Sequence, residues 1–438
     1  MARQTTDLTR EELERDEDHR LAPYAMRSAR ARRALPLERD GRIFDYRTEF
    51  QRDRDRVLHS RAFRRLRLKS HGGAFPPAER YRDRLTHSLE VSQLSRTAAR
   101  GLGLNEDLVE AIALGHELGM PPFARAGEAA LSALLGGGAG GSRHGFRYNE
   151  QSLRVVDLIE KRYEHAGVNL TDPTREGILK HAPEAPARSR PDGPAGEGLH
   201  LGWAPFFEAQ LVGVIDEVAS VVQDLDDALR AGDLEIAEVE SLPIVAELHR
   251  RIRPRRGGLF MRANVINRGL THMLVTSVIH HSRRSLRAWA KASGVETHEA
   301  FIAARGAVRP GTIGLTPAVR RLYDGLRSFL TRHLYQGAWL SGVAARARHL
   351  LGGLFRALTD DPRLADDYLL LRFKEEHGGR YLRDLPPAEI GAEMRRRYRG
   401  NARYARLVAD HIAGMTDLFA VSEYERLLGP FVMGGTRR

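Results

Sequence analysis

The chain has 438 residues, 42% of them hydrophobic and 29% charged, which is enough apolar material for a large core in one or two domains. It contains no cysteine, and this excludes disulfides, thiolate zinc sites and a cysteine nucleophile, so histidine and carboxylate side chains are the expected ligands of any metal. The formal charge of +12 is compatible with a nucleic-acid partner, but arginine on solvated helix faces is the favoured explanation, since aromatic residues do not alternate with the basic ones as in a single-strand binding groove.

No apolar run approaches the ~18 residues that a membrane helix needs, so we expect no membrane partner. The N-terminal segment from Met1 to Arg20 is charged rather than apolar and does not resemble a secretory signal peptide. We therefore expect a cytoplasmic protein.

Apolar residues recur with helical spacing along most of the chain. In chain order, helices are predicted near residues 85–94, 108–118, 206–230, 317–350 and 402–428, with Thr316 as the N-cap of the fourth. No long alternating run of β-branched residues is present, so the predicted fold class is all-α. The glycine-rich residues 136–142 and the Pro/Gly-rich residues 183–198 are predicted to be mobile surface loops, because neither can bury enough surface to offset its ordering entropy.

Histidine and carboxylate residues on the predicted helices form a candidate metal site. They are His87, the adjacent pair His116 and Glu117, and Asp216. Two antiparallel helices can present His87 and His116 toward each other, while carboxylates close the site and leave positions open for water and phosphate oxygens. A histidine that only satisfies a backbone carbonyl is compatible with the same spacing, so the spacing alone does not decide between the two interpretations.

Longer segments around these residues resemble a known family. They are LAPYA (21–25), FQRDRDR (50–56), AFRRL (62–66), RDRLTHSLEV (82–91) and LNEDLVEAIALGH (104–116). Further similar segments lie at 149–156, at 208–212 with Asp216, and at 412–417, so the resemblance spans most of the chain and thins between about 231 and 386. Together they resemble the bacterial deoxyguanosine triphosphate triphosphohydrolase family.

The resemblance implies an HD-domain helical fold with additional C-terminal helices. It implies a metal and nucleotide domain over residues 1–230 and, after a weak boundary near 231–243, a helical region over 231–438 that packs on the first and is not independent. The reaction of the family cleaves a dNTP to a deoxynucleoside and triphosphate with a divalent metal, here expected to be Mn²⁺ or Mg²⁺. Family members commonly assemble as homo-oligomers, and we expect the same of this chain.

The resemblance also assigns roles to individual residues. The metal ligands of the family fall on His87, His116, Glu117 and Asp216. Arg84 matches an arginine that holds substrate phosphate, and Arg64 and Lys69 are expected to add positive charge for a triphosphate. Glu128 is retained from the acid–base group around the leaving oxygen.

Departures from the family pattern cluster where the chemistry is expected. The aspartate of the HD pair is Glu117 here, and the added methylene moves the carboxylate by about 1.5 Å, against metal–ligand distances held within roughly 0.2 Å. Four histidines of the family are replaced, by Met120, Arg125, Tyr148 and Gln223. Methionine cannot transfer protons, and arginine is too weak an acid to do so near neutral pH. We therefore expect weak or lost activity, unless Tyr148 or His144 supplies the proton.

Two further departures concern the substrate. Arg125 can bind a phosphate bidentately and so convert a hydrolytic site into a binding site, or it can turn outward to solvent. At His71 the family usually has a glutamine that reads the nucleotide, so the base is not predicted.

Three hypotheses remain open at this point. The chain is a divergent, metal-dependent dNTP triphosphohydrolase, or a catalytically silent nucleotide-binding paralogue that regulates a partner, or a nucleic-acid-binding protein on the same scaffold. The retained ligands favour the first, the replaced histidines the second, and the net charge the third.

Overall fold

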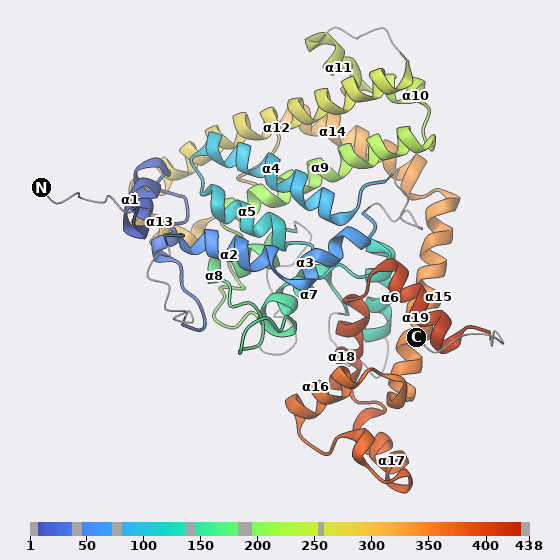
Figure 1. Cartoon of the computed structure of the whole chain (residues 1–438). Coiled ribbons are helices and arrows are strands. Elements are labelled where there is room, and N and C mark those ends of the chain that lie inside the picture. Colours follow the sequence, from blue (N-terminus) through green and yellow to red (C-terminus); the bar gives the residue numbers. More distant parts are fainter. Residues whose placement is uncertain are drawn as a thin grey trace, which may run out of the picture. The chain divides into compact units, whose positions relative to one another are not determined.

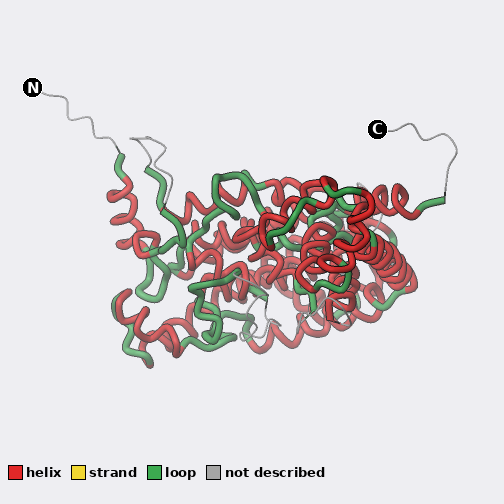
Figure 2. The backbone as a smooth tube through the Cα atoms, turned by 90° about the horizontal axis from the view of Figure 1, so that it is seen from below, coloured by secondary structure: helices red, strands yellow, loops and turns green. Residues whose placement is uncertain are grey.

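The computed structural model describes residues 8–36, 46–71, 81–136, 145–182, 195–252 and 258–430, and for these residues the predicted all-α fold class is confirmed. Figure 1 shows the helices, and Figure 2 shows no strand in this described part. None of the described helices is long and apolar enough to cross a membrane. The chain divides into two compact units, each assembled from three separate stretches.

The first unit comprises Met1–Arg64, Leu85–Leu118 and Ser152–Gln336. Its α-helices are α1 (Arg10–Arg20), α2 (Glu49–Leu58), α3 (Arg61–Arg65), α4 (Arg84–Leu102), α5 (Glu106–Gly115), α8 (Asp172–Lys180), α9 (Phe207–Ala231), α10 (Ile236–Glu240), α11 (Pro243–Arg251), α12 (Leu259–Ala292), α13 (His298–Ala304) and α14 (Pro317–Leu330). Short helical turns lie at Ser28–Arg30, Val155–Ile159, Arg305–Ala307 and Thr331–Tyr335.

The second unit comprises Arg65–Arg84, Gly119–Gln151 and Gly337–Arg438. Its α-helices are α6 (Ala124–Gly136), α7 (Tyr148–Arg154), α15 (Ala338–Asp360), α16 (Asp367–His377), α17 (Pro387–Glu393), α18 (Ala402–Ala413) and α19 (Asp417–Leu428). Short helical turns lie at Leu66–Leu68, Pro362–Leu364, Leu382–Asp384 and Met394–Tyr398.

The core of the first unit forms where α5 and α12 pack on α9 (Figure 1). Leu108 and Ile112 of α5 are fully buried, and so are Leu211 and Ile215 of α9 and Leu270 of α12. The pairs on α5 and α9 are each spaced four residues apart, which places both members on one face of the helix. This apolar contact fixes α9 against α5.

Local signals in the sequence set the ends of these two helices. The side chain of Asn105 caps α5 by accepting a hydrogen bond from the backbone N–H of Leu108, at 3.1 Å. Gly232, with φ of +81°, ends α9 in the left-handed conformation that favours glycine. Because α5 ends at Gly115, the pair His116 and Glu117 follows directly after the helix.

The second unit has a separate core, in which aromatic rings of α16 and α18 meet. Phe373 packs edge-on against Tyr404, with ring centroids 5.2 Å apart. The buried carboxylate of Asp417 accepts the backbone N–H groups of Ser70 at 2.9 Å and Phe123 at 3.0 Å. These bonds anchor the start of α6, where Phe123 and Ala124 have positive φ values of 62° and 56° that cost a non-glycine residue about 1–2 kcal/mol each.

Some predicted boundaries differ from the structure. The helix predicted over 317–350 is interrupted at Gln336 and Gly337, and the one predicted over 402–428 is interrupted at 414–416. Gly337 is the N-cap of α15, and the Thr416 side chain caps α19 by accepting from the N–H of Phe419. Of the predicted loops, Gly136 ends α6 and residues 195–198 form a turn, while 137–142 and 183–194 lie outside the described residues.

Glu208 at the start of α9 is a buried carboxyl group that joins three segments of the first unit. Its Oε1 accepts the backbone N–H groups of Met26 at 2.9 Å and Asn105 at 3.2 Å. Its Oε2 is buried and has no hydrogen-bond partner among the described residues. Burial raises the pKa of Glu208 to about 7, against the opposing effect of the Met26 and Asn105 N–H groups.

Glu208→Gln is expected to remove a pH dependence of stability. Because the folded pKa lies above the unfolded value of 4.5, the contribution of Glu208 is fully present below pH 4.5 and is lost as the pH rises through 7. Glutamine stays neutral and keeps an oxygen acceptor, so the variant should gain about 3 kcal/mol over wild type at pH 8 and little at pH 4.5. Urea unfolding at both pH values measures this. Glu238→Gln, at an exposed position, is the control, and parallel pH profiles for all three proteins would contradict the assignment.

Candidate metal centre

Three helices of the first unit bring two histidines and an aspartate together. His87 lies on α4, His116 is the residue after α5, and Asp216 lies on α9. One ligand atom from each lies within 4.8 Å of the others. Oδ1 of Asp216 is 2.9 Å from Nε2 of His87 and 3.7 Å from Nε2 of His116. Both imidazoles are completely buried, so the three side chains form a compact, enclosed group.

The hydrogen bond of His116 fixes which ring nitrogen faces this group. Nδ1 of His116 lies 2.6 Å from the carbonyl oxygen of Ala113, which can only accept, so Nδ1 carries the proton. Nε2 is then a lone-pair donor. It is buried and has no hydrogen-bond partner among the described residues, and it points toward Asp216. Ser152 donates its hydroxyl to the carbonyl of His116 at 2.8 Å and holds the backbone at this position.

His87 is oriented in the same sense by Gln223. Nδ1 of His87 donates to Oε1 of Gln223 at 2.6 Å, and the amide nitrogen of Gln223 donates to Glu90 at 2.5 Å. Gln223 follows Asp216 by seven residues, or two turns of α9, and Glu90 follows His87 by three on α4, so each pair shares one helix face. The chain Glu90–Gln223–His87 therefore directs Nε2 of His87 at Asp216.

The charges within this group are strongly coupled. Burial opposes a charged ring at His87, but the carboxylates of Glu117 and Asp216 raise the pKa of His87 to about 9. Burial also acts against a charged Asp216, but His116 and His87 hold its pKa well below the ordinary range. With a proton on Nε2, His87 forms an ion pair with Asp216. With that proton lost, the same nitrogen has a lone pair that could bind a metal ion.

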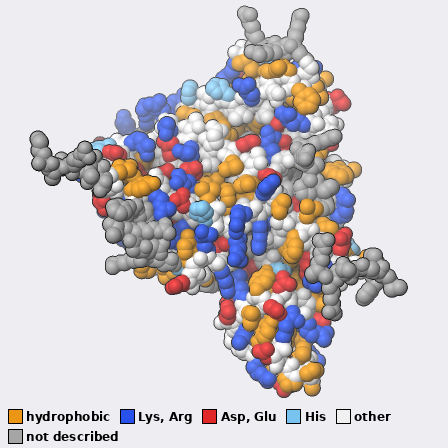
Figure 3. All heavy atoms as spheres, in the orientation of Figure 1, with side chains coloured by type: hydrophobic (Ala, Val, Ile, Leu, Met, Phe, Trp, Pro, Cys, Tyr) orange, Lys and Arg blue, Asp and Glu red, His pale blue; other side chains and the backbone are white. Residues whose placement is uncertain are grey.

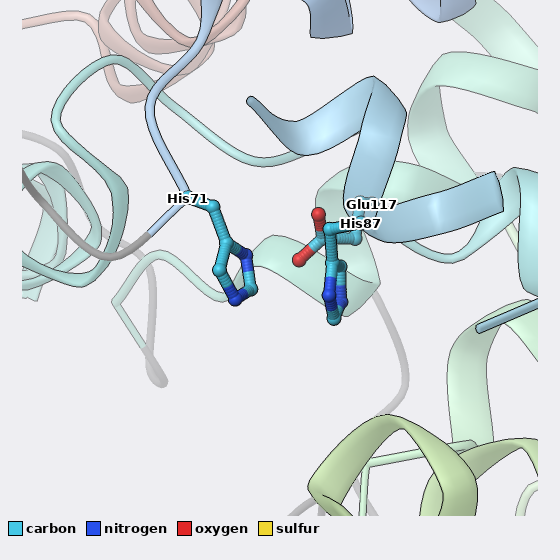
Figure 4. Close-up of side chains that lie close together, drawn as sticks. All are labelled: His71, His87 and Glu117. Atoms are coloured by element: carbon cyan, nitrogen blue, oxygen red, sulfur yellow. The ribbon is translucent and has the colours of Figure 1, made fainter. Parts of the chain in front are cut away.

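Glu117 lies beside His87, and Figure 4 shows the two side chains together. A carboxylate oxygen of Glu117 lies within 4.8 Å of a ring nitrogen of His87, but Glu117 is not a member of the group formed by His87, His116 and Asp216. His71, also drawn in Figure 4, belongs to the second unit. Glu217, next to Asp216 in the sequence, turns the other way and pairs with Arg320 at 3.3 Å.

A further histidine, His181, lies beside this group. His181 follows the last residue of α8, and its ring lies edge-on to His116 with centroids 5.0 Å apart. Its Nδ1 bonds to the carbonyl oxygen of Ile178 at 2.8 Å. Burial, together with the neighbouring His116, lowers the pKa of His181 to about 4, so the ring is neutral. A single histidine after a helix has no motif or spacing that predicts this position.

The donor set fits a divalent cation. Both histidines donate Nδ1–H to an oxygen acceptor and present Nε2 to Asp216, which is the outer-shell arrangement common to metal-binding histidines. Two imidazole nitrogens and a carboxylate suit Mn²⁺ and other first-row divalent ions. The Nε2 of His116, which has no hydrogen-bond partner in the part of the chain that the structure describes, is the clearest sign, because a buried ring nitrogen without a partner is otherwise costly.

The other residues selected from the sequence lie mostly in the second unit. Oε1 of Glu128 accepts the N–H of Tyr148 at 2.8 Å. Burial raises the pKa of Glu128, against the effects of that N–H and of the guanidinium groups of Arg125, Arg147 and Arg84.

The basic residues predicted to bind phosphate differ in their exposure and in their hydrogen-bond partners. Arg84 donates to the carbonyl of His71 at 2.9 Å, and the Lys69 ammonium donates to the carbonyls of Met120 and Ala413. Arg125 is exposed at the start of α6. In the first unit, Arg64 is exposed on α3, and His144 lies outside the described residues.

Comparisons with known proteins identify related chains. The HD domain family matches residues 84–226, and the phosphohydrolase-associated domain family matches residues 313–426. A protein of Thiobacillus denitrificans is 36% identical over 411 residues, which are 93% of this chain and 96% of the relative. A protein of Bordetella pertussis is 39% identical over 399 residues, which are 89% of this chain and 91% of the relative. Both relatives are named deoxyguanosinetriphosphate triphosphohydrolase-like protein.

Proposed function

This chain belongs to the family of deoxyguanosinetriphosphate triphosphohydrolase-like proteins with an HD domain, and from that premise we propose that it is a metal-dependent hydrolase of deoxynucleoside triphosphates. The products are the deoxynucleoside and triphosphate. The observation that carries the proposal is the pair of Nε2 atoms of His87 and His116 directed at Asp216. A homo-oligomer in the cytoplasm is part of the same proposal.

The proposed ligands are His87, His116 and Asp216, with Glu117 joining them from its place beside His87. A divalent cation held there supplies charge for the phosphate oxygens and lowers the pKa of water. Gln223 keeps the proton of His87 on Nδ1, so that Nε2 is available. His181 is neutral and adds no positive charge to oppose the cation.

Glu128 is the proposed proton donor to the leaving sugar oxygen. Burial raises the pKa of Glu128, and this increases the protonated fraction that can donate. Met120 and Arg125 cannot replace the proton transfer of the family histidines at their positions. Because each lost general acid or base typically costs about 10²- to 10⁴-fold in rate, the proposed turnover is slow.

A second candidate function is nucleotide binding without turnover. It is favoured by the basic surroundings of Glu128, where Arg125, Arg147 and Arg84 all act on its carboxyl group. Guanidinium groups suit phosphate oxygens. Arg64 and Lys69 remain proposed contributors to phosphate binding in both candidates.

The test combines metal analysis with a substrate panel on the full-length protein. After equilibration with Mn²⁺ and gel filtration, we expect close to one metal per chain by elemental mass spectrometry and slow triphosphate release from one or more of the dNTPs. Met120→His combined with Arg125→His should raise turnover by at least about 10²-fold at unchanged metal content. Metal-free protein that binds dNTP without release would instead support the second candidate.

A further inference from the structure

The 34-residue helix α12 carries an unusual share of the charge of this chain. It contains the six basic residues Arg262, Arg268, Arg283, Arg284, Arg287 and Lys291 and no aspartate or glutamate. This one helix therefore accounts for half of the formal charge of +12. Neither the candidate metal centre nor the proposed hydrolysis uses these side chains.

The C-terminal half of α12 presents its basic residues on one exposed side. We define the basic face of α12 as His280, Arg283, Arg284, Arg287 and Lys291, which are all exposed and recur at helical spacing. Figure 3 shows Lys and Arg side chains gathered at the upper left, over the end of α12 that lies near α1 in Figure 1. In the part of the chain that the structure describes, no ion pair neutralises the four Arg and Lys residues of this face.

Two acidic side chains on the helices that pack against α12 pair with arginines outside the basic face. On α9, Glu217 pairs with Arg320. On α11, Glu247 pairs with Arg251 at 2.8 Å. By contrast, Arg262 in the first turn of α12 pairs with Glu240 and lies outside the basic face. The positive charge of the basic face is therefore available to an external polyanion.

We propose that the basic face of α12 binds the phosphate backbone of duplex DNA without regard to sequence. From Arg283 to Lys291 the helix advances by about 12 Å, at 1.5 Å per residue. Over the same distance each strand of B-DNA presents about three or four phosphates, one per 3.4 Å of helix axis. The four basic residues in this interval match that number, and long exposed side chains can adjust to the backbone.

Two other polyanions fit this surface less well. Single-stranded nucleic acid needs aromatic side chains for base stacking. Trp289 is turned into the core, where it packs edge-on against Phe207 and Phe301 with centroids 4.9 and 6.0 Å apart. An anionic membrane surface calls for apolar residues beside the basic ones. The exposed large apolar residues of α12 lie at 259–261, at the opposite end of the helix.

The test measures binding of the full-length protein to a fluorescein-labelled duplex DNA of arbitrary sequence by fluorescence anisotropy. Wild type should bind with an affinity that falls with salt, with a log–log slope near −3.6 for about four displaced counterions. Arg283→Gln, Arg287→Gln and Lys291→Gln together should weaken binding at least about tenfold near 100 mM salt and reduce the slope by about 2.7. Glutamine is a good helix former, and circular dichroism checks that the fold is kept.

The matched control removes the same charge elsewhere. Arg348, Arg395 and Arg403 are exposed and form no ion pair within the described residues, so their combined replacement by glutamine should leave affinity and slope close to wild type. Equal losses in both triple variants, or none in the first, would overturn the proposal. So would binding of phosphatidylserine vesicles in place of DNA, or a change in oligomer size by light scattering as the only effect of the first variant. The measurement needs neither metal nor turnover, so its outcome is separate from that of the proposed hydrolase function.

Discussion

Asp216→Asn is expected to lower bound metal to background and dNTP hydrolysis by at least about 10³-fold. Oδ1 of Asp216 faces Nε2 of both His87 and His116, so the substitution replaces the anionic ligand of the group with a neutral amide of nearly the same shape. The two histidines with Glu117 beside His87 would hold a divalent cation weakly. Elemental mass spectrometry and triphosphate release, measured on the same samples, give both quantities.

Glu217→Gln is the matched control for this variant. It neutralises the adjacent carboxylate on α9, which pairs with Arg320 rather than facing the histidines, so metal content and turnover should stay near wild type. Gln223→Leu should give an intermediate result, because it keeps every ligand but removes the acceptor of the His87 Nδ1 proton, at a cost of about 10- to 100-fold in metal affinity. If Asp216→Asn retained stoichiometric metal, the centre would lie elsewhere.

Gly213→Ala is expected to lower the free energy of unfolding by about 3 kcal/mol. A Cβ at Gly213 would meet the carbonyl oxygen of His181 at 2.0 Å, a contact with backbone that no side-chain rotation relieves. α9 or the end of α8 must therefore move. Because the His181 ring packs on His116, that movement should also weaken metal binding. Urea unfolding and metal titration measure the two effects.

Gly325→Ala separates this contact from the general effect of glycine in a helix. Gly325 lies inside α14 and a Cβ there meets open space, so alanine should stabilise the protein by up to about 1 kcal/mol. The opposite signs of the two glycine-to-alanine changes are the expected signature. A Gly213→Ala protein as stable as Gly325→Ala would show that α8 and α9 can separate at no cost.

The helical fold was predictable because apolar spacing is a local property of the sequence. The prediction of a helix at 206–230 agrees with α9 (Phe207–Ala231) within one residue. Apolar spacing continued through the interruptions at Gly337 and Gly414, however, so the helices predicted there were too long. The capping residues that end one helix and begin the next are present in the sequence. The prediction followed the apolar periodicity instead and therefore joined the two helices.

The sequence predicted which residues form the candidate metal centre better than it predicted the contacts between them. Histidine and aspartate at the positions of the family motif indicated His87, His116 and Asp216. Which ring nitrogen faces the centre depends on how α4, α5 and α9 pack, and a single sequence does not contain that information. From the sequence, Gln223 was interpreted only as the replacement of a family histidine. In the structure its side-chain amide orients His87. The carboxylate of Glu117 remains a predicted metal ligand. The measurement of bound metal decides whether it belongs to the ligand set.

The interleaving of the two units has a consequence for synthesis of the chain on the ribosome. The chain passes between the units five times, and residues 337–438 are needed to complete the second unit. At about 5–20 residues per second, the first of these residues emerges about 10–40 s, and the last about 15–60 s, after the stretch that ends at Gln151. Until then, Phe123, Leu131 and Phe146 lack the partners from α15 and α18 that share their core. The nascent chain therefore exposes aggregation-prone surface late in translation, which makes it a natural client of chaperones.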